Sequence, residues 1–140
     1  MAILHIKIDE YLLSDDKNLI QTEKVFELLS KTYFAEKRSK DTIKKSIEHS
    51  LCFGVYSNGI QIGFARCFTD YAVTYYLCDV VISEEHRGRG LGKALVKFIA
   101  EHEQLSPLMG VLGTRDAHGL YEKFGFICDE GMYKPPISKP

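Results

Sequence analysis

The sequence carries no excess of charge of either sign. It contains 18 lysine and arginine residues against 19 aspartate and glutamate residues, which gives a formal net charge of −1 at pH 7. Proteins that bind nucleic acids usually present a strongly basic face, because their lysine and arginine side chains neutralise the phosphate backbone. The balance of charge therefore argues against a nucleic acid as the partner of this chain.

Long hydrophobic runs are also missing. A helix that spans a bilayer needs roughly 18 or more consecutive apolar residues, and no segment of this chain meets that requirement. Near the N-terminus, His5, Lys7, Asp9 and Glu10 interrupt the apolar residues, whereas a secretory signal peptide needs an unbroken apolar stretch and a small-residue cleavage site. We therefore expect no membrane partner and a cytoplasmic location.

Cysteine is sparse, and its spacing does not fit a zinc site or a disulfide scaffold. The four cysteines, Cys52, Cys67, Cys78 and Cys128, contain no CxxC pair, and each lies in an apolar stretch. Zinc sites need closely spaced ligands, and small secreted domains that depend on disulfides carry cysteine at higher density. The five histidines show no metal-ligand spacing either. We expect four buried free thiols and no metal.

Proline is nearly absent before the C-terminal end. Three of the four prolines lie in the last six residues, and there is no internal repeat, low-complexity tract or linker rich in proline, glycine or serine. A chain of 140 residues has the length of one ordinary domain. We expect residues 1–140 to form a single domain whose last residues are a tail.

Hydrophobic periodicity predicts the elements of the first half. Residues 5–8 alternate polar and apolar side chains, which is typical of a strand. Residues 22–33 place apolar side chains at helical spacing, and a second helix is predicted after Ser39 as its N-cap. Between the two helices, residues 32–38 mix aromatic and charged side chains. This loop either lines a site or merely connects the helices.

A hairpin and a buried strand are predicted next. Residues 52–56 and 60–69 flank Asn58-Gly59, a dipeptide that strongly predicts a β-hairpin. Residues 75–82 are almost continuously apolar, which is typical of a strand buried on both faces. The remaining predicted elements are a helix over 91–99, a strand over 108–113, a helix over 117–124 capped by Asp116, and two final strands over 125–128 and 132–134. The predicted order is β-α-α-β-β-β-α-β-α-β-β, an α/β fold (α+β mixed sheet) with helices packed on the sheet.

A glycine-rich loop, RGRGLG at residues 87–92, joins the buried strand to the next helix. Glycines allow positive φ and let the main chain approach a ligand closely, and the free amides and dipole of a helix start attract phosphate. Arg87 and Arg89 add positive charge. The alternative is a tight turn with two solvated arginines. The strand before the loop and the helix after it favour a phosphate site.

Two known phosphate-binding motifs do not fit this loop. The P-loop motif GxxxxGK[ST] needs serine or threonine where Ala94 follows Lys93. The dinucleotide fingerprint GxGxxG is also absent. A nucleotide-binding module is therefore the weaker interpretation.

Two other motifs occur in order, with a predicted strand between them. Arg87, Gly90 and Gly92 fit the pattern Arg/Gln-x-x-Gly-x-Gly/Ala, and residues 120–126 read LYEKFGF. Both motifs resemble those of the GNAT N-acetyltransferase superfamily, the second being similar to its LYxKxGF pattern. The order of predicted elements is similar to that of the family over nearly the whole chain. The resemblance implies the GNAT acyl-CoA N-acyltransferase fold.

The resemblance also implies acetyl-CoA as the acyl donor, with no metal. In the family, the loop amides hold the CoA pyrophosphate, while the preceding strand diverges from its neighbour and pairs with the pantetheine arm. A main-chain N–H there stabilises the acetyl oxygen as it becomes an oxyanion. The implied pyrophosphate-binding residues are Arg87, Gly88, Arg89, Gly90, Leu91, Gly92 and Lys93, and the implied pantetheine-binding residues are Val80, Val81 and Ile82.

Tyr121, in the second motif, is implied as the general acid that protonates the departing CoA thiolate. A thiol with a pKa of about 8.5 is a fair leaving group, and a phenol with a pKa of about 10 can donate to it. The alternative is a core aromatic residue whose hydroxyl lies at the surface. The family often has an asparagine seven residues before this tyrosine; Thr114 stands there instead, so that contact is not carried over.

The acceptor amine must lose a proton, because a lysine-like amine has a pKa of about 10.4. Asp79 is the best candidate for the general base, since a carboxylate in a buried strand is costly unless it is paired or functional. The alternative is a hydrogen bond to the backbone or to Arg66 on a neighbouring strand. Asp70 and Tyr71, in the turn before this strand, are candidates for shaping the acceptor pocket. Cys78 as a covalent nucleophile lacks an obvious histidine partner.

The predicted function is transfer of an acetyl group from acetyl-CoA to a primary amine of a small molecule or peptide, by direct attack. The alternative is a non-catalytic acyl-CoA-binding or sensing domain, which needs neither Tyr121 nor a base. A homodimer is compatible with the resemblance, through edge strands near the C-terminus. His86, beside the glycine-rich loop, is a candidate for contact with phosphate, and His118 lies on the predicted helix of Tyr121. For both histidines we favour an exposed position or a helix-capping role.

Overall fold

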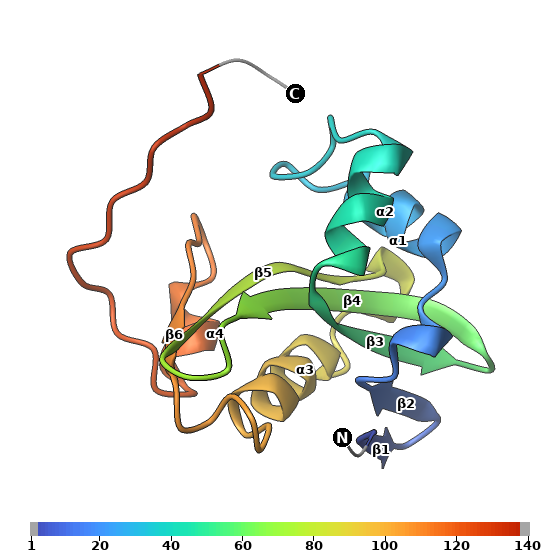
Figure 1. Cartoon of the computed structure of the whole chain (residues 1–140). Helices are drawn as coiled ribbons and strands as arrows, with labels where there is room; N and C mark the ends of the chain where they lie inside the picture. The colour runs from blue at the N-terminus through green and yellow to red at the C-terminus, as the bar shows by residue number, and fades with distance from the viewer. Residues whose placement is uncertain (1–2, 138–140) are drawn as a thin grey trace.

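A six-stranded mixed sheet runs through the molecule (Figure 1). The structure, a computed structural model, describes residues 3–137. The strands lie side by side in chain order, and neighbouring strands are antiparallel except β5 and β6, which are parallel. The strands are β1 (His5–Ile8), β2 (Tyr11–Ser14), β3 (Leu51–Ser57), β4 (Ile60–Thr69), β5 (Thr74–Ile82) and β6 (Met109–Val111). The mixed α/β fold predicted from the sequence is therefore confirmed.

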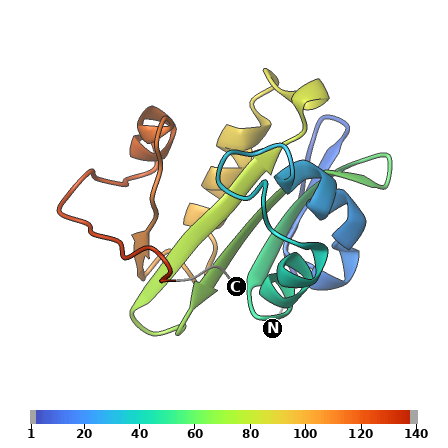
Figure 2. The ribbon, with the colours of Figure 1, turned by 90° about the horizontal axis from the view of Figure 1, so that it is seen from above.

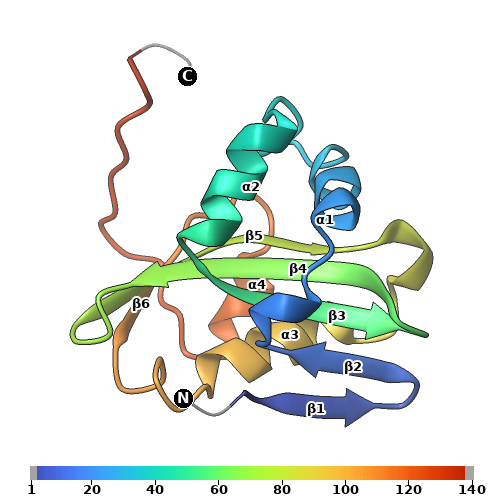
Figure 3. The same cartoon turned by 45° about the vertical axis from the view of Figure 1, so that its right-hand side comes forward.

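Helices cover both faces of this sheet (Figure 3). The helices are α1 (Thr22–Leu29), α2 (Lys40–Glu48), α3 (Leu91–Ala100) and α4 (His118–Glu122), with short 3₁₀ turns η1 (Lys17–Leu19) and η2 (Glu84–His86). α1 and α2 lie on one face and α3 on the other. Between residues 3 and 137, no helix is long and apolar enough to cross a membrane.

Two hydrophobic clusters form the core, one on each face of the sheet. On the α3 face, Leu95 and Ile99 pack with side chains of β2 and β3. On the opposite face, Val25 of α1 and Ile43 of α2 pack with Phe64 of β4. All five side chains are fully buried, and each contributes roughly 1.5–3 kcal/mol relative to exposure. The apolar stripe predicted for residues 91–99 is thus the buried face of α3.

The N-terminal hairpin contains a strand that the sequence pattern did not predict. β2 pairs with β1 on one side and with β3 on the other, and Asp9, with a φ of 53°, lies in the turn between β1 and β2. Tyr11, Leu13 and Ser14 are all buried. Because both faces of β2 are covered, its four residues lack the alternation of polar and apolar side chains that marks a half-buried strand.

The two final strands predicted over 125–128 and 132–134 are wrong. The structure has neither helix nor strand between residues 126 and 137. This segment runs away from the sheet (Figure 1), and Ile127 and Met132 are almost fully exposed. β6 has only three residues, so it offers a short edge for any further strand. The apolar residues that suggested strands are therefore left without a partner strand in the described chain.

The four cysteines are free, but they are not all buried. Cys52 and Cys67 are buried, Cys78 is partly buried and Cys128 is exposed. The prediction of buried thiols is therefore wrong for Cys128, because that residue lies in the extended C-terminal segment rather than in a strand of the sheet.

Tyr56 of β3 provides a test of the packing. Its hydroxyl is buried and has no hydrogen-bond partner among residues 3–137, and burial raises the pKa of this phenol. A buried polar group without a partner costs roughly 1–3 kcal/mol. We therefore expect Tyr56→Phe to raise the free energy of unfolding by about 1 kcal/mol, measured by urea denaturation with an unchanged m-value. A lower free energy of unfolding in the variant would contradict this.

Candidate active site

β5 and β6 are paired only over their first residues. Their parallel pairing begins at Thr74 with Met109 and ends at Tyr76 with Val111. Beyond it, the chain after β6 diverges from β5 (Figure 2). Within the described residues, the second half of β5 therefore has β4 on one side and no strand on the other. Backbone N–H and C=O groups along such an open edge are free to pair with an extended ligand.

A β-bulge lies in this open half of β5. Phe64 of β4 pairs with Val81, and Arg66 pairs with Cys78, so β5 contains one extra residue between these two pairs. Within the bulge, Asp79 has a φ of 57°, in the left-handed region that costs a non-glycine residue about 1–2 kcal/mol. Because a bulge bends its strand and increases the local twist, it favours the divergence of β5 from β6.

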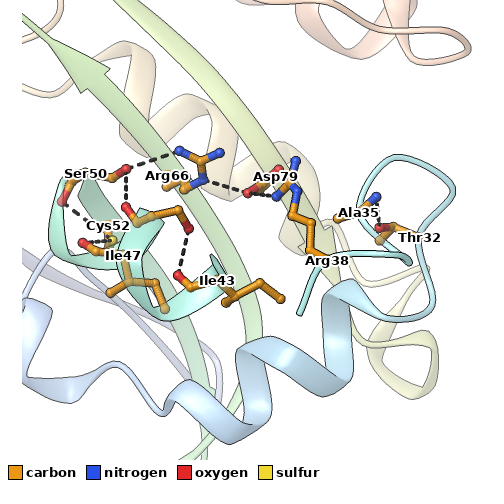
Figure 4. Close-up of polar contacts among 10 residues, drawn as sticks. Thr32, Ala35, Arg38, Ile43, Ile47, Ser50, Cys52, Arg66 and Asp79 are labelled. Carbon is orange, nitrogen blue, oxygen red and sulfur yellow. Dashed lines mark hydrogen bonds and ion pairs between the residues drawn. The ribbon is translucent and has the colours of Figure 1, made fainter. Parts of the chain in front are cut away.

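Two guanidinium groups hold the Asp79 carboxylate (Figure 4). Its Oδ2 accepts from Nε of Arg66 at 2.6 Å and from Nη1 of Arg38 at 2.7 Å, and its side chain is 2% exposed. Arg66 also donates to Oγ of Ser50 at 3.2 Å. Burial opposes the charge of Arg66, but the charge and hydrogen bond of Asp79, together with Cys78 and Cys52, outweigh burial and raise the pKa of Arg66. These contacts tie together β4, β5 and the loop between α1 and α2.

The loop after β5 leads into an open helix N-terminus. Gly88 and Gly90 have φ values of 79° and 77°, which favour glycine. Gly90 is the N-cap of α3; no side chain caps this helix, and its first turn has no acidic residue. Arg87 donates from Nε to the carbonyl of Ile82 at 3.1 Å, which fixes the arginine beside the end of β5. The first N–H groups of α3 and its dipole are suited to bind an anion.

A cleft of about 490 Å³ lies between these elements. This volume is in the range of small-molecule and cofactor sites. The lining residues are Lys31, Thr32, Tyr33 and Phe34 after α1, Val80, Val81 and Ile82 of β5, His86, Arg87, Gly88, Gly90, Leu91 and Gly92 around the glycine loop, and Asp116, Ala117, Leu120 and Tyr121 at α4. Parts of both sequence motifs therefore meet at one site.

Tyr121 brings a proton donor into this cleft. Its ring packs edge-to-face against Phe126, with 6.0 Å between the ring centroids. Burial raises the pKa of Tyr121, and Tyr33 and Asp116 raise it further. The phenol is therefore protonated at neutral pH.

A family model described as an acetyltransferase (GNAT) domain matches residues 48–128. The match includes the open half of β5, the glycine loop, α3 and the LYEKFGF motif. The chain belongs to the GNAT acetyltransferase family. It is accordingly an acyl-group transferase, and its sheet and helices are those of that family.

Individual relatives support the GNAT assignment. A Gibberella zeae protein named as an acetyltransferase is 30% identical, over 81% of this chain and 77% of that protein. The crystal structure of a GNAT-family acetyltransferase from Xanthomonas campestris pv. campestris has a TM-score of 0.84 at 36% identity and covers 94% of this chain and 98% of that one. Glucosamine-6-phosphate N-acetyltransferase from Arabidopsis thaliana, at 14% identity and a TM-score of 0.65, over 91% of this chain and 99% of that one, shares the fold alone.

Most residues implied by the GNAT motifs line the cleft. The exceptions among the cofactor-binding predictions are Arg89 and Lys93. Arg89 donates from Nη1 to the hydroxyl of Tyr11 in β2 at 2.8 Å, and Lys93 lies exposed on α3. These two cations therefore lie outside the lining of the cleft.

Asp79, the predicted general base, does not line the cleft. It forms the ion pair with Arg66 that was the alternative to a catalytic role, and Arg38 is a second partner that the sequence pattern did not indicate. Its neighbour Cys78 is unsuited to covalent catalysis, because burial raises the pKa of its thiol to about 11 and a nucleophilic cysteine needs a thiolate.

Asp70 and Tyr71, proposed to shape an acceptor pocket, lie at the opposite end of β5 from the glycine loop. Oδ1 of Asp70 accepts hydrogen bonds from the backbone N–H groups of Val73, Ala72 and Thr74. These bonds lower the pKa of the Asp70 carboxyl. The residues therefore shape the turn between β4 and β5, and neither lines the cleft.

The loop between α1 and α2 contributes aromatic side chains to the cleft, the role that the sequence had left open. Tyr33 and Phe34 line it, and the guanidinium of Arg115 lies 3.6 Å from the centroid of the Tyr33 ring. Such a cation–π contact is worth about 0.5–1 kcal/mol at an exposed site. Because Arg115 lies between β6 and α4, the contact links the two sides of the cleft. In the sequence, only the aromatic residues of the segment 32–38 could have indicated that this loop lines the cleft.

Two side chains near the motifs, Asp116 and His86, differ from expectation. Asp116 does not cap α4; Oγ1 of Thr114 accepts a hydrogen bond from the N–H of Ala117 at 3.0 Å instead. Asp116 lines the cleft, and so does His86, which was expected to be exposed or to cap a helix. His118 is exposed, as expected.

The ion pairs of Asp79 provide a test of the structural role of this residue. Breaking a buried ion pair costs about 3–5 kcal/mol, so we expect Asp79→Asn to lower the free energy of unfolding by about that amount, measured by urea denaturation. The exposed pair between Glu23 and Lys40 provides the control, because Glu23→Gln removes a surface pair worth about 0–1 kcal/mol. Equal stability of the two variants would contradict the structural role of Asp79.

Proposed function

We propose that this chain binds acetyl-CoA and transfers its acetyl group to a primary amine of a small molecule or peptide, on one domain spanning residues 1–140. One observation carries the proposal: the open edge of β5, the N-terminus of α3 and Tyr121 all line the same cleft. Each of these features suits a different part of the donor. The open edge suits the amide-containing arm, the helix start suits the pyrophosphate, and the phenol suits the leaving thiolate.

The pyrophosphate is proposed to lie on the loop from Arg87 to Gly92. Two glycines with positive φ in this loop let the main chain approach the phosphate oxygens closely. The N–H groups at the start of α3 donate to those oxygens, and the helix dipole adds to the attraction. Arg87 supplies a full positive charge beside the same cleft, and Lys93 a more distant one.

The pantetheine arm is proposed to extend the sheet along Val80, Val81 and Ile82. These residues line the cleft and lie where β5 has left its pairing with β6. An amide-containing chain that enters this gap pairs with the backbone as an additional strand does. This mode of binding places the thioester in the cleft, within reach of the residues on β5 and α4.

The chemical step follows from that position. The amine nitrogen attacks the acetyl carbon, and the carbonyl oxygen takes up negative charge that a main-chain N–H of β5 stabilises. Loss of one such donor typically costs about 10²–10³ in rate. The C–S bond then breaks with its electron pair on sulfur, and Tyr121 donates a proton to the thiolate. The raised pKa of Tyr121 keeps this proton on the phenol until the thiolate forms.

The proton released by the amine needs an acceptor. Asp79 as the general base stays a prediction, but its carboxylate is buried and holds two guanidinium groups, and it does not line the cleft. We favour water in the cleft as the first acceptor, with Asp79 as a positioning residue that maintains the bulge in β5. The proposed reaction uses no metal. Within residues 3–137, no three histidine, cysteine, aspartate or glutamate side chains gather closely enough to hold one.

A non-catalytic acyl-CoA-binding or sensing domain is the alternative. Such a domain would need the glycine loop but would not need a proton donor beside the thioester. The position of Tyr121 in the cleft favours the enzyme. A cytoplasmic location and a homodimer stay predictions from the sequence.

The direct test is calorimetry with acetyl-CoA, run alongside detection of free thiol with a panel of amines. The panel contains a peptide amine, a polyamine, an aminoglycoside and a small amino metabolite. We expect binding, and thiol release with one class of amine. Binding without thiol release on any amine would favour the sensing domain, and an absence of binding would refute the assignment of the cleft.

A Tyr121→Phe variant tests the role of the general acid. We expect kcat to fall by about 10²–10⁴, the range for loss of general acid catalysis, while the Kd for acetyl-CoA stays unchanged because the ring is retained. The control is Tyr133→Phe, which removes the hydroxyl of a tyrosine that is almost fully exposed in the C-terminal segment. If Tyr121→Phe raised the Kd for acetyl-CoA by the same factor as it lowered kcat, the role of Tyr121 would not be confined to the chemical step.

A further inference from the structure

A buried tyrosine on β2 contacts two residues of the glycine-loop region. The hydroxyl of Tyr11 lies 2.8 Å from Nη1 of Arg89 and 2.8 Å from Nδ1 of His86. Tyr11 itself is 3% exposed, and the contacts join residues 78 and 75 positions apart in the sequence. The first hairpin of the fold is thus connected to the segment where β5 leads into α3.

The direction of these two hydrogen bonds fixes the position of a proton on His86. A guanidinium group only donates, so Arg89 donates to the Tyr11 oxygen. A phenol has one proton, and within residues 3–137 Nδ1 of His86 is the one acceptor recorded beside the Tyr11 hydroxyl. We therefore assign this proton to the hydrogen bond from Tyr11 to Nδ1 of His86. Nδ1 consequently carries no proton, and the proton of the neutral imidazole lies on Nε2. The two hydrogen bonds that link Arg89, Tyr11 and His86 thus select one tautomer of the imidazole.

The same contacts also fix the position of the imidazole. The Tyr11 and His86 rings pack edge-to-face, with 5.6 Å between centroids and an interplanar angle of 87°. His86 lines the cleft together with Arg87 and Gly88. Within residues 3–137, the structure records a hydrogen bond only for Nδ1 of this ring, so the protonated Nε2 is free to donate to a ligand.

We propose that Tyr11 is a positioning residue for the phosphate end of the cleft, and that His86 donates from Nε2 to a phosphate oxygen of CoA. The proposal rests on the proposed function, since it needs CoA in this cleft. A donor whose proton and ring plane are already fixed loses less conformational freedom on binding than a mobile one. Arg89 takes part through Tyr11, although it does not line the cleft itself.

The first test is the tautomer of His86 in the protein without ligand. Long-range ¹H–¹⁵N NMR correlations distinguish a protonated Nε2 from a protonated Nδ1. We expect His86 to be the Nε2–H tautomer in the unmodified chain and a mixture of tautomers in Tyr11→Phe, which removes only the hydroxyl. A protonated Nδ1 in the unmodified chain would overturn the proposal, whatever the result of any binding experiment.

The second test compares affinities for CoA and for pantetheine, which has no phosphate, in Tyr11→Phe. We expect the Kd for CoA, measured by calorimetry, to rise about 10- to 100-fold, as loss of one hydrogen bond to a charged group implies. The Kd for pantetheine, measured by NMR titration, should not change. His86→Ala should raise the Kd for CoA similarly, and adding Tyr11→Phe to it should have little further effect, because both changes remove one contact.

Tyr56→Phe is the matched control for this experiment. Tyr56 lies on β3, in the strand next to Tyr11, and pairs with Leu12. Its hydroxyl has no hydrogen-bond partner among the residues from 3 to 137, so the same substitution there should leave the affinity for CoA unchanged.

The outcomes separate this proposal from the proposed function. CoA binding by the unmodified chain, with an equal Kd in a folded Tyr11→Phe variant, would overturn the positioning role and leave the proposed function intact. Equal losses of CoA and pantetheine affinity would also overturn it, since they would indicate a general distortion of the cleft. No CoA binding by the unmodified chain would refute the proposed function, and the phosphate contact with it.

Discussion

The ion pairs of Asp79 with Arg66 and Arg38 hold together the part of the sheet on which the site is built. Asp79 has a backbone conformation that costs about 1–2 kcal/mol, and its carboxylate is buried, which costs several kcal/mol more without a partner. Both costs are offset only while the two guanidinium groups are in place. Because Arg66 lies in β4 and Arg38 follows α1, one carboxylate fixes β4, β5 and the aromatic loop relative to one another.

The other features of the site follow from the course of β5. The bulge lies just beyond the last pair between β5 and β6, so the strand reaches the glycine loop with one edge open. The loop then starts α3 in a position where its N-terminus faces the same cleft as that edge. α4 returns Tyr121 to the opposite side of the cleft, and Arg115 connects this side to Tyr33. The residues proposed to bind CoA and the proposed proton donor thus share one cleft, although they come from distant parts of the chain.

The sequence predicts those parts of the molecule whose structure is encoded locally. The strand over 75–82, the loop at 87–92 and the apolar face of α3 were all predicted, because periodicity and glycine placement are local signals. The prediction that this strand is buried on both faces was wrong, since Tyr76 is exposed and Cys78 and Val80 are only partly buried. β2 was missed because its four residues are too few to form a recognisable apolar run or an alternating pattern. The two last strands were wrong because apolar residues alone do not provide a neighbouring strand. The pairing of Asp79 with Arg38, and of Arg89 with Tyr11, depends on contacts between segments 41 and 78 residues apart. No local pattern indicates such contacts.

Amide hydrogen exchange by NMR, with and without CoA, tests the central claim most directly. The claim is that the open edge of β5 receives the pantetheine arm while the glycine loop receives the pyrophosphate. We predict that CoA slows exchange at one or more amides from Val80 to Ile82 and in the first turn of α3. The amide of Tyr75, where β5 already pairs with β6, should be unchanged. Protection confined to other parts of the protein, with no change along β5, would contradict the account.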